Sequence, residues 1–353
     1  MKSGLTFVLL FLLILPLQAE EVVPHGVVLM YHRFEENRYP STNIRMAQFR
    51  AQLDYLQQEG FIFWPLRRML DAIFNGHEIP DRTVALTVDD AYLSVYQQAY
   101  PLLKERKLPL TVFVSTTAID QDHGGYMSWQ QMREMQQHNI DFANHSASHL
   151  HLTRRMDGEG KCQWLERVRQ DIEQARQRLQ QELGPQGLPL FAYPFGEYNG
   201  DVAKLLNKMS YLALGQHSGA IGPGSDKQAL PRFPINERLA ALDSFAVKAS
   251  ALPLPLALHH PEEPELAAEN PPRLTLELEP NAPLSAGQIT CYLGDGTRLE
   301  SKEKSKRSLT VQASEPLPPG RSRYNCTAAA GGGRFYWFSQ PWFNGPDPAD
   351  PAY

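Results

Sequence analysis

Short apolar runs alternate with amphipathic stretches between residues 26 and 235. The apolar runs are rich in β-branched and aromatic residues, which is typical of buried strands. They predict strands at 26–31, 61–64, 84–88, 110–114, 140–143, 190–193 and 211–214. Between them, apolar residues three and four positions apart predict helices over 46–56, 92–103, 129–135 and 161–183. This alternation indicates an α/β fold, a parallel sheet covered by helices, and the number of strands suits a TIM-like barrel.

The pattern changes after residue 250. Residues 251–272 are rich in proline and acidic residues, which predicts a linker or a wrapped extended segment. Beyond them, short runs at 274–278, 289–293, 309–311 and 335–338 are separated by turns rich in Gly and Pro. That pattern is typical of a small β-sandwich. We therefore expect a barrel domain over 20–250, a Pro-rich linker over 251–272 and a C-terminal β-sandwich over 273–353.

The first 19 residues have the pattern of a secretory signal peptide. Lys2 precedes an apolar run over residues 5–15, Pro16 interrupts it, and Ala19 offers a cleavage point. The run is too short to span a bilayer, which takes about 20 residues. We therefore expect a periplasmic or secreted protein that is not an integral membrane protein.

Composition and cysteine content narrow the class of protein. Hydrophobic residues make up 42% and charged residues 21%, as in a folded globular chain, and the net charge of −5 argues against a nucleic-acid-binding protein.

In an oxidising compartment, Cys291 and Cys326 are expected to form a disulfide, while Cys162 is expected to be buried on a helix. Tyr324, two residues before Cys326, has the spacing of a tyrosine corner and favours an immunoglobulin-like sandwich. The aromatic residues near the C-terminus could bind a glycan, although packing of a β core is commoner.

Chemically reactive side chains follow the predicted strands. His32 follows the first strand, Asp89 and Asp90 follow the strand at 84–88, and His145 and His149 follow the strand at 140–143. The carboxyl ends of barrel strands meet at one mouth, so these groups are expected to lie together. Histidines four residues apart on one helical turn can bind one metal ion, and imidazole with carboxylate suits Zn²⁺, with Co²⁺ or Ni²⁺ as alternatives. His151 could replace His149, but it would break the one-turn spacing.

The two adjacent aspartates at the end of one strand point in different directions and can hold different roles. One can complete a metal site with the two histidines, leaving a coordination position open for water, as in catalytic zinc sites. The other can act as a general base. Capping of the following helix by Asp90 is the structural alternative.

Three short segments resemble motifs of the polysaccharide deacetylase family, the NodB-homology domain of carbohydrate esterase family 4. They are Thr-Val-Asp-Asp at 87–90, His-Ser-Ala-Ser-His at 145–149 and Tyr-Pro-Phe-Gly at 193–196. The resemblance covers residues 26–236 and implies a distorted (β/α)7 barrel that removes acetyl groups from an N-acetylated amino-sugar polysaccharide. It also implies that Asp89 is the base, that Asp90, His145 and His149 bind a divalent metal ion, and that the backbone N–H of Phe195 contributes to an oxyanion hole.

Two departures from the family pattern concern the base and the acid. Ala192 stands where the family has an arginine that orients the base, and Arg232 is a candidate replacement. The family's usual motif with the catalytic-acid histidine, which comes late in the domain, is missing. Instead, Tyr31-His32 after the first strand resembles the branch that acts on exported β-1,6-linked N-acetylglucosamine polymer. The resemblance therefore implies His32 as the general acid, with His217 as the alternative.

The sequence leaves two other functions open. A barrel of this kind could hydrolyse another non-peptide C–N bond, or the chain could bind or assemble a glycan without catalysis. Chitin fragments, peptidoglycan and β-1,6-linked polymer all remain candidate glycans, and no pattern indicates an oligomeric state.

Overall fold

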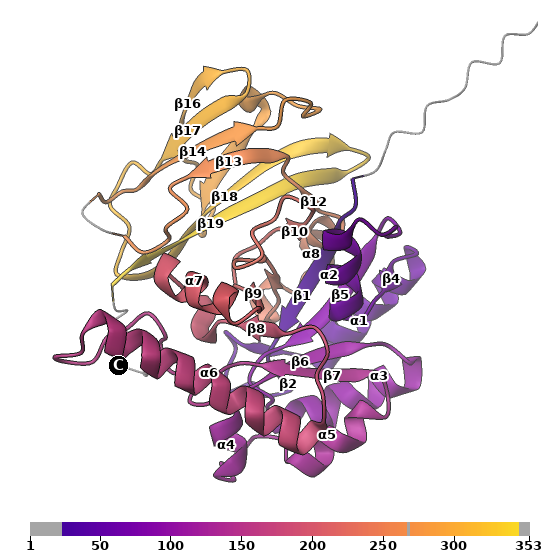
Figure 1. Cartoon of the computed structure of the whole chain (residues 1–353). Helices are drawn as coiled ribbons and strands as arrows, with labels where there is room; N and C mark the ends of the chain where they lie inside the picture. The colour runs from indigo at the N-terminus through magenta and orange to yellow at the C-terminus, as the bar shows by residue number, and fades with distance from the viewer. Residues whose placement is uncertain (1–22, 267–268, 346–353) are drawn as a thin grey trace, which may run out of the picture.

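A computed structural model of the chain describes residues 23–266 and 269–345, and the predicted signal peptide lies outside them. Figure 1 shows a mixed α/β part, coloured indigo to magenta, with the C-terminal strands, coloured orange to yellow, against one side of it. The C-terminal strands thus lie against the part of the chain that carries the reactive side chains.

A curled, largely parallel sheet forms the centre of the α/β part. Its strands are hydrogen-bonded in the order β10-β1-β5-β6-β7-β8-β9, with β4 beside β5 and β11 beside β1. All seven predicted strands are present in it to within one residue at either end. Their bounds are β1 Gly26–Tyr31, β4 Ile62–Phe63, β5 Thr83–Val88, β6 Leu110–Val114, β7 Ile140–Asn144, β8 Leu190–Ala192 and β9 Leu212–Leu214, joined by β10 Ala220–Ile221 and β11 Phe233–Pro234.

The sheet curls far enough for its far strand to approach the first. The β1 strand pairs in parallel with both β5 and β11, and a parallel bridge joins Leu214 of β9 to Leu230 just before β11. The strands β1 and β5 are buried along their whole length, which explains their continuous apolar sequences. The result is a half-barrel, and a small parallel pair, β2 Arg33–Phe34 with β3 Asn43–Ile44, follows the end of β1.

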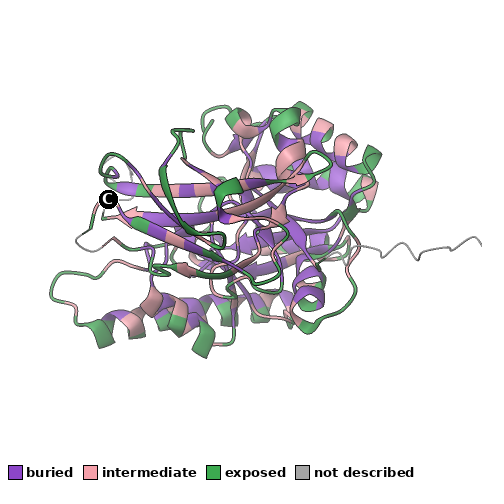
Figure 2. Ribbon diagram, turned by 90° about the horizontal axis from the view of Figure 1, so that it is seen from above, coloured by how far each residue is buried: buried purple, intermediate pink, exposed green. Residues whose placement is uncertain are grey.

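Helices cover the outside of this sheet, and in Figure 2 their buried residues face it. The predicted helix at 92–103 is a π-helical turn, Val95–Ala99, that continues as α3, and four helices were not predicted: α2, α4, α7 and α8. No helix within 23–266 or 269–345 is long and apolar enough to cross a membrane. The bounds are α1 Met46–Gln58, α2 Leu66–Asn75, α3 Tyr100–Arg106, α4 Thr116–Asp120, α5 Trp129–Gln136, α6 Lys161–Leu183, α7 Gly200–Lys208 and α8 Leu242–Ala249.

The expectation that Cys162 is buried is wrong. Helix α6 has the predicted bounds, but its buried stripe begins at Trp164 and continues through Val168 and Ile172 at four-residue steps. Cys162 lies two residues before Trp164, about 200° around the helix from it, and is exposed.

Two four-stranded sheets form the C-terminal part of the described chain, in the orders β12-β19-β18-β15 and β13-β14-β17-β16. Leu276 and Val311 from one sheet share a buried cluster with Cys326 and Trp342 from the other. The Pro-rich segment supplies the first strand of each sheet, so much of it is extended chain wrapped onto the sheets. The bounds are β12 Leu252–Pro253, β13 Leu256–His260, β14 Arg273–Leu278, β15 Thr290–Leu293, β16 Glu300–Ser305, β17 Ser308–Gln312, β18 Gly320–Gly331 and β19 Arg334–Asn344.

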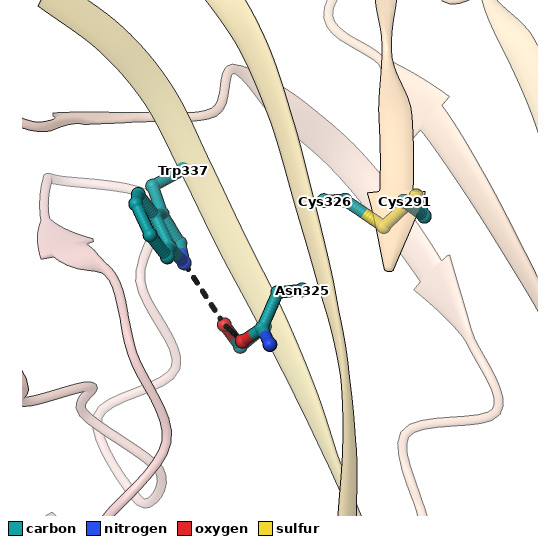
Figure 3. Close-up of a disulfide and its surroundings, with 5 residues drawn as sticks. Cys291, Asn325, Cys326 and Trp337 are labelled. Carbon is teal, nitrogen blue, oxygen red and sulfur yellow. Dashed lines mark hydrogen bonds between the residues drawn. A yellow bond between two sulfur atoms is a disulfide. The ribbon is translucent and has the colours of Figure 1, made fainter. Parts of the chain in front are cut away.

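The predicted disulfide between Cys291 and Cys326 is present (Figure 3). Its cysteines lie opposite each other on neighbouring strands of one sheet, β15 and β18. An immunoglobulin disulfide joins the two sheets instead, so the immunoglobulin-like arrangement is not confirmed. In the same sheet, Trp337 donates a hydrogen bond to Ser339 (Figure 3). The Trp337 ring also packs edge-on against Phe233 of β11, and this contact joins the sheet to the half-barrel.

Removing this disulfide should destabilise the C-terminal sheets. It closes a loop with a sequence separation of 35 residues, and crosslinks of that length typically contribute about 2–4 kcal/mol by restricting the unfolded chain. We expect Cys291→Ala/Cys326→Ala to lower the free energy of unfolding by that amount in urea titrations. The exposed Cys162→Ala is the matched control and should not change it; equal stability of the double variant would contradict the prediction.

Candidate active site

The strand ends bring the predicted metal ligands together. Asp90 follows β5, His145 follows β7, and His149 lies four residues further on. One ligand atom from each lies within 4.8 Å of the other two. The Nε2 atoms of His145 and His149 lie 3.3 Å and 3.0 Å from Oδ1 of Asp90.

This donor set fits a divalent metal ion. Oδ1 of Asp90 is buried and makes no hydrogen bond, although two imidazole nitrogens point toward it. Nδ1 of His145 lies 2.8 Å from the backbone oxygen of Ala192, a contact that requires the proton on Nδ1 and leaves the lone pair of Nε2 free for a metal. One carboxylate with two imidazoles is the ligand chemistry of zinc and its neighbours in the transition series.

The charges in this cluster depend on one another. Burial acts to raise the pKa of Asp90, but the contacts with His149 and His145 outweigh it and hold that pKa well below its ordinary value. Burial acts to lower the pKa of His149, but Asp90 outweighs it and the pKa is raised. The Asp90 carboxylate is therefore ionised. It can either accept hydrogen bonds from protonated imidazoles or bind a cation.

The residues between the two histidines do not form the expected helical turn. Residues 145–149 are an irregular bend, with Ser146 and His149 in the left-handed region at φ 67° and 55°. The Asp171 carboxylate on α6 accepts hydrogen bonds from the amides of Ala147 and Ser148 and fixes this bend. The rings of His145 and His149 still lie 4.9 Å apart, so the four-residue spacing identified the pair although its geometry was wrong.

Left-handed backbone occurs at several strand ends of the site. For residues with a side chain this conformation is costly and is characteristic of functional sites held by a rigid scaffold. Besides the two in the histidine bend, the residues concerned are Asp90, Ala91 and Phe195.

Asp89 is fully buried and forms an ion pair with Arg232. Nη1 and Nη2 of Arg232 donate to the two carboxylate oxygens at 2.6 Å and 2.8 Å, and Nε donates to the backbone oxygen of Gly215. Both side chains have no exposed surface. Burial acts to raise the pKa of Asp89, but Arg232 and the nearby imidazoles lower it overall. Arg232 thus occupies the position that the missing arginine at Ala192 would serve.

The structure places the two candidate acids differently. His32 interacts electrostatically with both Asp89 and Asp90, and burial lowers its pKa. His217 lies beside Tyr198, on the side toward the C-terminal sheets, and burial lowers its pKa to about 3. Of the two candidate acids, His32 is therefore the one near the carboxylate pair, and His217 is uncharged near neutral pH.

Phe195 and His151 form a layer over the metal-ligand cluster. The Phe195 ring lies 4.7 Å from the His149 ring and stacks on the His151 ring at 3.9 Å. Nδ1 of His151 lies 2.6 Å from Oε2 of Glu197, so His151 is engaged outside the ligand cluster. The sequence offered no signal for Glu197 or Asp171, because neither lies in a recognised motif and each contacts a segment remote from it in sequence.

Comparison with known proteins agrees with this geometry. Residues 76–214 match the family model described as polysaccharide deacetylase. This part of the chain is therefore similar to polysaccharide deacetylases, as the three motifs indicated.

Several of the relatives that resemble this chain are named poly-β-1,6-N-acetyl-D-glucosamine N-deacetylase. The poly-β-1,6-N-acetyl-D-glucosamine N-deacetylase of Escherichia coli (strain K12) is 24% identical over 258 residues, a match that covers 62% of this chain and 38% of that protein. The protein of the same name in Staphylococcus aureus (strain MRSA252) is 22% identical, with 55% and 68% covered. The structure of IcaB from Ammonifex degensii has a TM-score of 0.56 and 26% identity, with 64% and 97% covered.

Removing Arg232 should expose how much the site depends on its ion pair. Arg232→Met leaves the Asp89 carboxylate buried without a partner, which typically costs about 3–5 kcal/mol. The wild-type pair stabilises the fold above the unfolded-state pKa of Asp89, and this contribution disappears as pH falls through the lowered folded-state pKa. We therefore expect the stability loss in urea titrations to be largest near neutral pH and to shrink toward acid pH.

A double variant separates the ion pair from mere packing. Asp89→Asn/Arg232→Met removes both charges and should lose less stability than Arg232→Met alone. Arg273→Gln, at an exposed position on β14, is the control and should have no effect. A double variant less stable than Arg232→Met would contradict the assigned pair.

Proposed function

We propose that this chain is an exported, metal-dependent polysaccharide deacetylase that releases acetate from N-acetylglucosamine units of a β-1,6-linked polymer. The convergence of Asp90, His145 and His149 beside the buried Asp89 carries the proposal. The names of the relatives support the substrate, and the predicted signal peptide supports export to the compartment where such a polymer would be found.

Asp90, His145 and His149 would hold the ion, which is zinc by the ligand chemistry, with cobalt or nickel as alternatives. A divalent cation at this position supplies Lewis-acid polarisation of the acetyl carbonyl and lowers the pKa of an attacking water. The contact between Nδ1 of His145 and the Ala192 carbonyl keeps the Nε2 atom oriented for this role.

Asp89 is assigned as the general base. Its pKa is lowered by Arg232, so the carboxylate is ionised and can accept a proton over a wide pH range. The bidentate contact fixes the carboxylate plane, which keeps the accepting oxygen in one position. Arg232 is therefore a positioning residue, which acts through Asp89.

Phe195 and His32 complete the proposed reaction. The backbone N–H of Phe195 is assigned to the carbonyl oxygen as it becomes negative, a role supported by the left-handed turn that brings this residue against His149. His32 is assigned to protonate the nitrogen that leaves as a free amine, because it adjoins the carboxylate pair. The C–N bond breaks as that proton is delivered, and acetate and glucosamine are the products.

Acetate release from the zinc-loaded protein tests this function. We expect residues 20–353 to bind one divalent ion per chain and to release acetate from β-1,6-linked N-acetylglucosamine oligomers, with loss of activity on chelation and recovery with Zn²⁺. Asp89→Asn should keep the metal and lose about 10²–10⁴-fold in kcat, whereas His145→Ala should lose both. Metal binding without acetate release would overturn the assigned substrate. Full activity of Asp89→Asn would overturn the assigned base.

Paired histidine variants test the acid. His32→Gln should lower kcat by about 10²-fold or more while metal content is unchanged, because proton delivery to the nitrogen is lost. The loss in kcat for His217→Gln should be much smaller, since burial holds the pKa of His217 near 3. Metal content and kcat are measured side by side, and a larger kcat loss for His217→Gln would reverse the assignment.

A further inference from the structure

A cleft of about 510 Å³ lies between the half-barrel and the C-terminal sheets. This volume falls within the range of about 300–1,000 Å³ that small-molecule sites occupy. Phe195, Gln216 and His217 line it from the half-barrel, and Asp295, Arg321 and Arg323 line it from the C-terminal sheets. Of these lining residues, only Phe195 belongs to one of the three sequence motifs.

The cleft adjoins the candidate catalytic groups through Phe195. Phe195 contacts the metal-ligand residue His149 and also lines the cleft. On the opposite side the lining includes Pro234 of β11, which pairs with Met30 of β1, the strand that leads to His32. A polymer with one unit at the catalytic groups therefore reaches the cleft with a neighbouring unit.

The wall formed by the C-terminal sheets carries two arginines, Arg321 and Arg323, against one carboxylate, Asp295, and so has a net positive charge. Arg323 is partly buried, burial lowers its pKa, and Nη1 donates to the backbone oxygen of Gln216 at 3.4 Å. Within the described chain no carboxylate forms an ion pair with Arg323. A charged group that is removed from water without a counter-charge is costly unless a ligand supplies hydrogen-bond acceptors.

Arg321 lies on the same strand and faces the catalytic side. Its Nη1 atom lies 3.4 Å from Oε1 of Glu197, and its guanidinium carbon lies 5.5 Å from the centre of the Phe195 ring. Glu197 also bonds His151, which stacks on Phe195. The C-terminal sheet is therefore connected by side chains to the layer over the metal ligands.

We propose that this cleft is a sugar-binding subsite of the deacetylase and that Arg323, helped by Arg321, makes it selective for N-acetylated units over units with a free amine. Hydroxyl and acetamide oxygens of an acetylated unit can accept hydrogen bonds from the guanidinium groups. A glucosamine unit carries an ammonium charge, which the cationic wall repels. The enzyme would then leave its free amines spaced along the polymer instead of adjacent.

This inference rests on the proposed function, and a binding assay separates the two. Calorimetry on the zinc-loaded full chain compares a fully acetylated β-1,6 pentamer with one that carries a single internal free amine. We expect wild type to bind the acetylated pentamer about tenfold more tightly, a difference of about 1.4 kcal/mol, and the ratio to fall at high salt. Arg323→Gln should weaken binding of the acetylated pentamer and reduce the ratio to about twofold or less.

Further variants keep the test decisive. Arg323→Lys retains the charge and should keep most of the selectivity, Arg321→Gln should reduce it independently, and the exposed Arg273→Gln is the control. If acetate is released while the two pentamers bind equally to wild type, the subsite is wrong and the deacetylase stands. If the pentamers bind selectively but no acetate appears, the subsite stands and the catalytic proposal is wrong. If neither pentamer binds, the subsite is wrong.

Discussion

The buried ion pair between Asp89 and Arg232 connects the parts of the site and the fold. Arg232 precedes β11 and reaches across the end of the sheet to Asp89 after β5, while its Nε atom bonds Gly215 after β9. It therefore joins three strand ends at the place where the far strand of the half-barrel approaches the first. Such a pair is tolerated in the interior only because each guanidinium nitrogen has an acceptor and both carboxylate oxygens have donors.

This constraint explains how strained backbone can persist around the metal ligands. Asp90 directly follows the paired carboxylate and lies in the left-handed region at φ 73°, and His149 and Phe195 do the same after other strands. Each lies on a turn that follows a buried, hydrogen-bonded strand, β5, β7 or β8, so the scaffold fixes the starting point of every turn. The candidate reactive groups are thus positioned by the strand ends, as a site that must orient several groups requires.

Local pattern was enough to predict the strands and the residues of the metal cluster, but not how the chain joins them. Continuous apolar runs identify buried parallel strands, and acids and histidines directly after them identify one mouth. The bend at 145–149 depends on Asp171 from a distant helix, and the disulfide within one sheet depends on the strand order of the C-terminal part. The bend and the disulfide both depend on contacts between segments remote in sequence, and the periodicity of the sequence does not reveal such contacts. Arg232 was found only because this sequence has Ala192 where the family pattern has an arginine.

The proposed metal ligands and base are the groups that the family motifs already specify, so they would not distinguish one acetylated polymer from another. Selectivity must come from residues beside them, and here the nearest such surface comes from a different part of the chain. Phe195 belongs to both regions, because its ring contacts His149 on one side and lines the cleft on the other. A positively charged wall in this cleft would change the binding energy of a neighbouring amine without contacting the reacting bond. Under the proposed function, the C-terminal sheets would therefore influence which acetyl groups are removed, while the chemistry would stay that of the half-barrel.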